Sequence, residues 1–287
     1  MAVKPVIYGQ SERPPRGDYT RARADYTCDQ DFAAYTEADH DTWRKLYARQ
    51  SALLPGLAAQ SFMDLLPQLD AAQGIPRFED INARLLPATG WQLVGVPGLI
   101  PEVPFFTLLA SQKFPVTDWI RTPQEMDYVV EPDVFHDLFG HVPLLFDATY
   151  ANYIQAYGQA ALKANALERS RSDCAYAVEH LARLYWYTIE FGLLRECGSI
   201  RAYGAGNLSS PGELPHSVNS PASQRLPLNG VPELLNCMAS SYKIDSYQSQ
   251  YFVIESFAAL LELTEPDFTP HYQQLAAERG ESTASIA

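Results

Sequence analysis

Two stretches, PDVFHDLFGHVPLL (132–145) and LARLYWYTIEFGLL (181–194), carry the polar residues that the fold has to bring together. The first stretch sets His136 and His141 five residues apart, and in the second Glu190 interrupts an otherwise apolar run. Two imidazoles and one carboxylate form the facial ligand set that holds non-haem Fe(II) and leaves coordination positions open for oxygen. The two stretches therefore predict an iron site in an oxygen-activating enzyme.

The spacing of the two histidines decides how they can meet. Asp133 is a suitable N-cap for a short helix over residues 134–139. On an α-helix of about 3.6 residues per turn, side chains five residues apart point roughly 140° away from each other. We therefore expect Gly140 to end this helix in a left-handed C-cap, so that His141 swings back toward His136.

Glu190 favours a joint site with the histidines. Its neighbours are expected to be buried, and an unpaired buried carboxylate costs several kcal/mol unless it meets a cation, a metal or a proton. A salt bridge to Arg183 or Arg195 is one alternative, and a pair of unrelated core or surface histidines is another. No HExxH motif or cysteine pair at ligand spacing is present, and four further histidines are weaker candidate ligands: His40, His180, His216 and His271.

Composition limits the possible partners and the compartment. The chain has 287 residues, 47% of them hydrophobic, and a net charge of -13, which argues against nucleic-acid and anionic-membrane partners. No stretch approaches the roughly 20 apolar residues of a membrane span, and residues 1–17 lack the apolar core of a signal peptide. The four cysteines have no CxxC spacing, which is typical of reduced thiols. We expect a cytoplasmic protein.

Helical periodicity dominates the chain, and no repeat or linker divides it. Strands are expected near 91–98 and 199–206 and at the start of 243–254. Helices are expected over 42–54, 61–69, 78–86, 103–112, 148–166, 173–194, 231–240 and 252–263. This pattern predicts a mainly α fold with many helices, a few short strands and a single domain.

Four motifs make the chain similar to the bacterial phenylalanine 4-hydroxylases, within the pterin-dependent aromatic amino acid hydroxylase family. They are EPDVFHDLFGHVPLL (131–145), YWYTIEFGL (185–193), RAYGAGNLSSPGE (201–213) and YQSQYFVIESF (247–257), in that order. The resemblance implies the aromatic amino acid hydroxylase fold. It covers a catalytic domain (26–276), which is followed by a C-terminal tail (277–287). Because the basic residues near the start are interleaved with acidic residues and proline, we expect residues 1–25 to form a loosely ordered N-terminal arm.

The resemblance further implies a reaction. Fe(II) would be held by His136, His141 and Glu190, with tetrahydrobiopterin or a related tetrahydropterin beside it. O2 would be the co-substrate, and L-phenylalanine would be hydroxylated to L-tyrosine through a pterin-assisted ferryl intermediate. Such an oxidant needs a dry pocket that positions the substrate, which suits the aromatic surroundings of the three ligands.

The same resemblance assigns residues on the pterin side. The segment PGLIPEVPFF (97–106) matches the family's pterin loop. By that match, backbone groups of Gly98, Leu99 and Ile100 would meet the edge of the pterin, and Phe105 would stack on its ring. Asp137 stands where the family places an acidic residue that reaches the pterin through water.

On the substrate side, Arg121 lies where the family uses an arginine to clamp the substrate carboxylate. Asp133 would orient His136 as an acceptor behind the metal ligand. The side chains expected to line the amino acid site are Trp186, Phe191, Gly206 and Ser209.

Several alternatives remain at this stage. Phenylalanine is preferred as substrate because Trp186 takes space that the tryptophan branch leaves for an indole, but tyrosine or tryptophan hydroxylation stays possible. A non-catalytic pterin- or metal-binding relative and a zinc hydrolase with the same three ligands are the other candidates. Because no sustained heptads follow Phe268, we expect a monomer without activation by phenylalanine. We expect the segment 166–177 to be a surface insertion that leaves the metal ligands in place.

Overall fold

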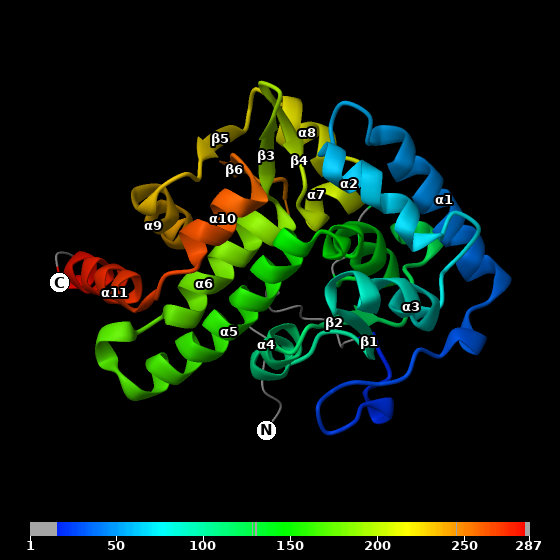
Figure 1. Cartoon of the computed structure of the whole chain (residues 1–287), viewed down its shortest axis with the longest axis horizontal. Helices are drawn as coiled ribbons and strands as arrows, with labels where there is room; N and C mark the ends of the chain where they lie inside the picture. Colours follow the sequence, from blue (N-terminus) through cyan, green and yellow to red (C-terminus); the bar gives the residue numbers. More distant parts are fainter. Residues whose placement is uncertain (1–15, 128, 130, 245, 285–287) are drawn as a thin grey trace.

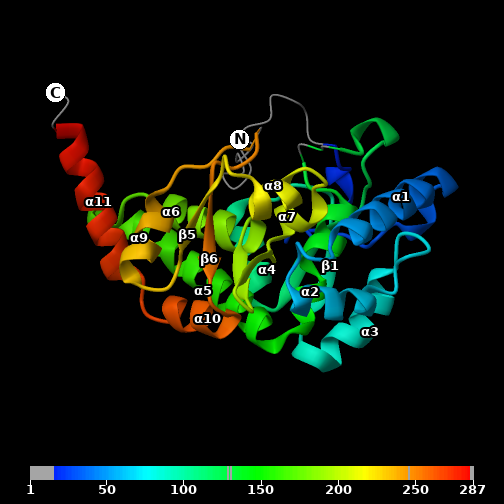
Figure 2. The same cartoon turned by 90° about the horizontal axis from the view of Figure 1, so that it is seen from above.

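The computed structural model describes residues 16–127, 129, 131–244 and 246–284. Most of them belong to helices, as Figures 1 and 2 show. The α-helices are α1 (Glu37–Leu53), α2 (Gln60–Leu65), α3 (Phe78–Thr89), α4 (Glu102–Ala110), α5 (Ala148–Ser170), α6 (Ala177–Tyr185), α7 (Ala205–Ser209), α8 (Glu213–Asn219), α9 (Val231–Ala239), α10 (Phe257–Thr264) and α11 (Thr269–Ala284).

Two short sheets accompany the helices. The first is parallel and pairs β1 (Gln92–Val96) with β2 (Lys113–Thr117). In the second, β3 runs antiparallel to β4 and parallel to β6, and β5 joins the far side of β6 in parallel. Its strands are β3 (Leu193–Glu196), β4 (Ser199–Ala202), β5 (Gln224–Pro227) and β6 (Gln250–Ile254). The mainly α architecture with few short strands is confirmed.

The hydrophobic core gathers around α5. This helix packs against α4, α6 and α10, and in Figure 1 α5 and α6 run side by side. Large aromatic side chains fill the interior, and several of them are fully buried: Trp43, Trp91, Tyr150, Tyr153, Phe62 and Phe135. This core supports two π-helical turns, His136–His141 and Trp186–Glu190.

Two predicted helices are wrong in part. The helix expected over 173–194 stops at Tyr185, continues as the π-helical turn and is followed by β3. The helix expected over 252–263 begins only at Phe257, where the side chain of Ser256 accepts a hydrogen bond from the Ala259 N–H. Its first residues belong to β6, which lies at the end of 243–254 and not at the start of that segment, where a strand was expected. Short apolar runs fit a buried strand and a buried helix equally well, so periodicity alone misplaced both boundaries.

The ends of the described chain are folded against the rest. Arg16 pairs with Glu125 at 2.7 Å, and Arg21 pairs with Asp118 at 2.6 Å. At the other end, α11 contacts α9. The segment 166–177 lies at the junction between α5 and α6, where a surface insertion was expected. Within the described residues, no helix combines the length and the apolar character needed to cross a membrane.

Candidate metal centre and the pockets beside it

The segment that carries the two histidines is helical from Val134 onward. Asp133 caps its start, because its Oδ1 accepts the backbone N–H of His136 at 3.0 Å. The expected left-handed end at Gly140 is wrong, since Gly140 is not among the residues with positive φ. Instead the chain forms a π-helix over His136–His141. Its hydrogen bonds run from each residue to the fifth one along, and this register brings two residues five apart onto one face.

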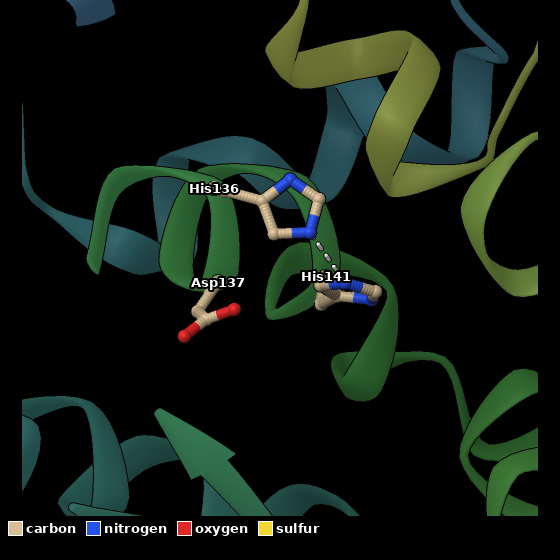
Figure 3. A group of neighbouring side chains, drawn as sticks. All are labelled: His136, Asp137 and His141. Carbon is tan, nitrogen blue, oxygen red and sulfur yellow. Dashed lines mark hydrogen bonds between the residues drawn. The ribbon is translucent and has the colours of Figure 1, made fainter. Parts of the chain in front are cut away.

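The two imidazoles meet at their Nε2 atoms, which lie 3.2 Å apart (Figure 3). Glu190, at the end of the second π-helical turn, faces the same point. Its Oε1 lies 3.3 Å from Nε2 of His141, and its Oε2 lies 3.5 Å from Nε2 of His136. The alternative ion pairs are not formed, because Arg183 binds Glu179 and Arg195 binds Glu255. The structure thus brings together the three predicted ligands from segments far apart in sequence.

The three atoms fit one metal ion. Bonds from a metal to imidazole nitrogen or carboxylate oxygen are about 2.1 Å long, and the two Nε2 atoms and the carboxylate that faces them lie close enough together for one ion to reach an atom of each side chain. The site is dry, with side-chain exposures of 13% for His136 and 3% each for His141 and Glu190. Burial also lowers the pKa of His136 to about 4, so its imidazole is neutral near pH 7, as metal binding requires.

Asp137 is the competing candidate for the third ligand, because its carboxylate lies within 4.8 Å of the ligand atoms of both histidines. However, its Oδ2 already accepts the backbone N–H of Thr117 at 2.7 Å. Burial raises the pKa of Asp137 to about 7, because the charged carboxylate has little contact with water at this position. The shorter distances from both histidines favour Glu190 as the ligand and leave Asp137 beside the site.

Ser209 supports His136 from behind. Its Oγ lies 2.8 Å from Nδ1 of His136 and donates to the carbonyl of Ala205 at 2.8 Å. Because the hydroxyl proton of Ser209 is used, the oxygen must accept from Nδ1–H, which leaves the Nε2 lone pair for a metal. Among the described residues, Nδ1 of His141 has no such partner. The orienting role expected of Asp133 falls to Ser209, since Asp133 binds the backbone of His136 and not its ring.

Asp133 also forms a buried ion pair with Arg121. The guanidinium Nε and Nη2 each lie 2.8 Å from one carboxylate oxygen, and the backbone N–H of Arg121 donates to Oδ2 at 2.9 Å. Burial alone would raise the pKa of Asp133, but the charge and hydrogen bonds of Arg121 hold it below its usual value. No described residue accepts from Nη1 of Arg121, so this nitrogen remains to meet a further anion.

All five residues expected to bind the pterin line one pocket: Gly98, Leu99, Ile100, Phe105 and Asp137. Phe105 lies at the wall of this pocket, where its ring centroid is 5.9 Å from that of Tyr185. Gly98 has a φ of +156°, and a Cβ at this position would lie 2.9 Å from the hydroxyl of Tyr19. The loop can adopt this course only with glycine there.

Sequence reasoning missed several residues of this pocket. Glu102, Thr117 and Pro132 line it as well, and Oε1 of Glu102 is buried without a partner in the described structure. Tyr19 holds the loop from outside by donating to the carbonyl of Leu99 at 2.8 Å. Glu102 is the one acidic residue of the segment 97–106 and could have been identified for that reason. The sequence around Tyr19 contains no pattern that predicts its contact with Leu99.

The residues expected to line the amino acid site surround Glu190. The rings of Trp186 and Phe191 have centroids 4.7 Å apart. Gly206 allows this arrangement, because a Cβ there would lie 2.7 Å from the Phe191 ring. Ser209 lies on the same short helix, α7, and reaches His136. Arg121 is connected to the first ligand segment through its pairing with Asp133, which caps that segment.

Comparisons with known proteins agree with this geometry. The model of the family described as biopterin-dependent aromatic amino acid hydroxylase matches residues 9–270. The phenylalanine-4-hydroxylase of Ralstonia nicotianae is 47% identical over 88% of this chain and 77% of its own length. That of Caulobacter vibrioides is 44% identical over 97% of this chain and 90% of its own.

A solved structure is similar in the same way. The iron- and phenylalanine-bound phenylalanine hydroxylase of Chromobacterium violaceum superimposes with a TM-score of 0.81 at 46% identity, covering 89% of each chain. A cobalt-bound structure of the same bacterial enzyme gives a TM-score of 0.83, at 47% identity over 89% of this chain and 88% of that one.

Proposed function

The chain belongs to the biopterin-dependent aromatic amino acid hydroxylase family, and we propose that it hydroxylates L-phenylalanine to L-tyrosine with Fe(II), O2 and a tetrahydropterin. The observation that carries this proposal is the convergence of three side chains. The Nε2 atoms of His136 and His141 lie 3.2 Å apart, and the two carboxylate oxygens of Glu190 lie 3.5 Å and 3.3 Å from them, one oxygen facing each imidazole. When bound, Fe(II) and the tetrahydropterin together reduce O2, so that one oxygen atom enters the aromatic ring and the other leaves on the pterin.

The protein would hold the metal through His136, His141 and Glu190. Three protein ligands leave the other coordination positions of the ion to non-protein groups. The hydrogen bond from Nδ1–H of His136 to Ser209 fixes the tautomer in which Nε2 can bind metal. The low exposure of the three ligands excludes bulk water, which would otherwise quench a reactive oxidant.

The pterin would occupy the pocket between β2, α4 and Asp137. We assign backbone contacts to Gly98, Leu99 and Ile100 and ring stacking to Phe105, because all of them line this pocket. The carboxyl group of Asp137 would accept hydrogen bonds from the N–H groups of a pterin, directly or through water, through the positions that Thr117 does not use. Its hydrogen bond from Thr117 keeps the carboxylate turned toward the pocket.

The amino acid would lie against Trp186 and Phe191, with Gly206 and Ser209 at the floor of its site. Its carboxylate would meet Arg121, whose guanidinium is already held in place by Asp133. This pair gives Arg121 a fixed direction, so a substrate carboxylate would find a positioned cation at little ordering cost. The carboxylate of Asp133 thereby links Arg121, which would bind the substrate, to the segment that carries His136 and His141.

Other functions are less well supported. A zinc hydrolase would have no use for a pocket shaped by the pterin loop, although zinc would occupy the same ligands. A non-catalytic relative would be expected to lose some of the metal ligands, whereas all three are in place. Tyrosine or tryptophan hydroxylation is disfavoured because relatives at 42–47% identity are phenylalanine-4-hydroxylases.

We also propose that the enzyme acts in the cytoplasm as a monomer. The four cysteines carry free thiols in the structure, which suits a reducing compartment. The helix that follows Phe268, α11, packs against α9 and the segment Ser172–Cys174 of its own chain. Light scattering that shows a tetramer, or sigmoidal phenylalanine kinetics, would contradict the monomer.

The function is tested by aerobic turnover of purified, Fe(II)-loaded protein with tetrahydropterin and each of phenylalanine, tyrosine and tryptophan. We expect tyrosine from phenylalanine at near one-to-one coupling with pterin oxidation. Pterin oxidation without a hydroxylated amino acid would show that the substrate assignment is wrong. If neither reaction occurs with iron bound, the non-catalytic alternative is correct.

A further inference from the structure

The side-chain amide of Gln248, between α9 and β6, binds the indole of Trp186. Nε1 of Trp186 donates to Oε1 of Gln248 at 3.1 Å. Nε2 of Gln248 donates to the carbonyls of Lys243 at 2.6 Å and Ser246 at 3.2 Å. Gln248 is 4% exposed. One buried amide therefore connects the indole with the backbone of the segment that precedes β6.

The backbone of Gln248 is itself fixed by α8. Its N–H donates to Oε1 of Glu213 at 3.0 Å, and its carbonyl accepts from Nε2 of His216 at 3.2 Å. The hydroxyl of Tyr251 donates to the same Glu213 oxygen. Glu213 is buried, and its pKa is raised by that burial. Gln248 is thus anchored by helix α8 on its backbone and faces Trp186 with its side chain.

Two aromatic rings complete the surroundings of the indole. Tyr242 stacks on Trp186 with ring centroids 4.2 Å apart and an interplanar angle of 16°. Phe191 lies at 4.7 Å with an angle of 40°. Rotation of the indole would separate these rings and would break the shorter of the two hydrogen bonds to Oε1 of Gln248, leaving the backbone N–H of Lys243 at 3.5 Å as its donor. Loss of a hydrogen bond in this buried position carries a cost.

We propose that Gln248 is a positioning residue that sets the orientation of Trp186 and thereby the width of the amino acid site. This inference rests on the proposed function, in which Trp186 lines that site. Gln248 acts through the indole and need not touch the substrate. The site admits a phenyl ring and excludes larger side chains because the indole is held in one orientation from behind.

The chemistry of the residue explains why an amide is needed. The same side chain must accept a hydrogen bond from the indole and donate to two backbone carbonyls. Glutamate can do only the first when ionised, and leucine can do neither. Gln248→Glu and Gln248→Leu therefore separate the acceptor from the donors without a large change in side-chain volume.

Gln250 provides a matched control. It lies two residues further along, in β6, and its Nε2 donates to the hydroxyl of Tyr187 at 3.3 Å. Tyr187 follows Trp186 in the chain, but its hydroxyl has a second partner, the carbonyl of Ser241 at 2.6 Å. Gln250→Leu removes a similar hydrogen bond from the same region without touching the indole of Trp186.

The test combines kinetics with a signal of the indole itself. The contribution of Trp186 to the near-ultraviolet circular dichroism is obtained for each protein by subtracting the spectrum of the same protein that also carries Trp186→Phe. In Gln248→Leu we expect this contribution to be lost or inverted. We also expect the KM for phenylalanine to rise about tenfold, which corresponds to about 1.4 kcal/mol. The KM for the pterin should change less than about twofold, and kcat/KM for tryptophan relative to phenylalanine should rise.

Gln248→Glu is expected to keep the fold and part of the indole signal, with an intermediate KM. Gln250→Leu should leave both readouts as in the unaltered protein. An unchanged indole signal in both Gln248 variants would overturn the proposal, whatever the turnover. So would equal effects of Gln248→Leu and Gln250→Leu. If no amino acid is hydroxylated by the unaltered protein, the proposed function fails, while the indole signal still decides whether Gln248 positions Trp186.

Discussion

The two π-helical turns supply ligands to the same candidate metal site, but different interactions hold them. The turn His136–His141 is fixed by charge, because the buried Asp133–Arg121 pair caps the helix from which it continues. The turn Trp186–Glu190 is fixed by neutral hydrogen bonds. Oγ1 of Thr188 donates to the carbonyl of Leu184 at 2.6 Å and lies 2.8 Å from the hydroxyl of Tyr153.

This difference has a physical consequence. A buried ion pair tolerates the loss of both partners better than the loss of one, since a single buried charge remains uncompensated. Neutral hydrogen bonds contribute about 0.5–1.5 kcal/mol each, so a single loss in the second turn should be milder. Loss of one charged partner at the first turn should therefore lower the free energy of unfolding strongly, whereas loss of one hydrogen bond in the second turn should lower it only slightly.

Removal of a ligand from either turn should have the largest effect. We expect His136→Ala, His141→Ala and Glu190→Ala to abolish hydroxylation and to lower the iron content sharply, because two ligands do not hold Fe(II) firmly. The fold should survive, as judged by far-ultraviolet circular dichroism. Asp137→Asn is the control, and it should retain iron while its affinity for the pterin falls. Full activity in any of the three ligand variants would remove that residue from the site.

Loss of Arg121 should be the next largest effect and should act on two properties at once. Arg121→Ala should raise the KM for phenylalanine, with about 2–4 kcal/mol lost for a charge-assisted pair in a partly dry site. It should also lower the free energy of unfolding by about 3–5 kcal/mol, because Asp133 is left buried and unpaired. Chemical denaturation and steady-state kinetics measure the two effects.

The double variant Arg121→Met with Asp133→Leu separates the roles of Arg121. It should recover part of the stability, since neither charge of the pair remains, while the hydrogen bonds from the backbone N–H groups of Arg121 and His136 to Asp133 stay lost. It should not recover the low KM for phenylalanine. If the double variant also regained the original KM, the substrate carboxylate would be bound elsewhere.

In the second turn, Thr188→Val is expected to destabilise the protein by about 1–2 kcal/mol. The change keeps the shape of the side chain and removes the hydrogen bonds to Leu184 and Tyr153. Iron content should stay close to that of the unaltered protein. A loss as large as that caused by Arg121→Ala would contradict the distinction between the two turns.

The smallest effect should be a pH dependence of stability from His180, on the helix that leads into the second turn. Its Nδ1 lies 2.8 Å from the carbonyl of Met238, and its Nε2 is buried without a described partner. Burial lowers the pKa of His180, so below about pH 6.5 the unfolded chain binds a proton that the folded protein does not. The free energy of unfolding should therefore fall as the pH decreases below about 6.5.

His180→Gln should flatten this dependence when the two proteins are compared in the same metal state, so that other titrating groups cancel. The Asp133–Arg121 pair should add no slope in this range. The pKa of Asp133 is lowered, so its stabilisation is lost only as the pH falls through its folded pKa, below 3.8. Parallel stability profiles for both proteins would show that folding does not lower the pKa of His180.

The contrast between the turns also marks how far the sequence predicts the structure. The ligand types and their apolar surroundings were readable from His136, His141 and Glu190, because buried polar residues need a partner. Most helices followed from periodicity, as for α1, α3 and α5. The π-helical hydrogen bonding could not be predicted. The spacing of the two histidines is compatible both with a helix that ends at Gly140 and with one that continues as a π-helix.

Long-range partners were the other limit. The family resemblance assigned the acceptor behind His136 to Asp133, which binds the backbone N–H of His136, whereas the ring binds Ser209, 73 positions further on. Gln248 lies 62 positions from Trp186, and Tyr19 lies 80 from Leu99. Such contacts depend on how the helices pack, which local patterns do not contain. The family resemblance identified the pterin loop but not these supports.

The central claim is that both turns bind one metal ion through His136, His141 and Glu190. It is tested most directly by a crystal structure of the Fe(II)-loaded protein with anomalous data collected at the iron edge. We predict a single strong peak about 2.0–2.3 Å from Nε2 of each histidine and from a carboxylate oxygen of Glu190. A peak bound by Asp137 in place of Glu190, or iron at another position, would contradict the account.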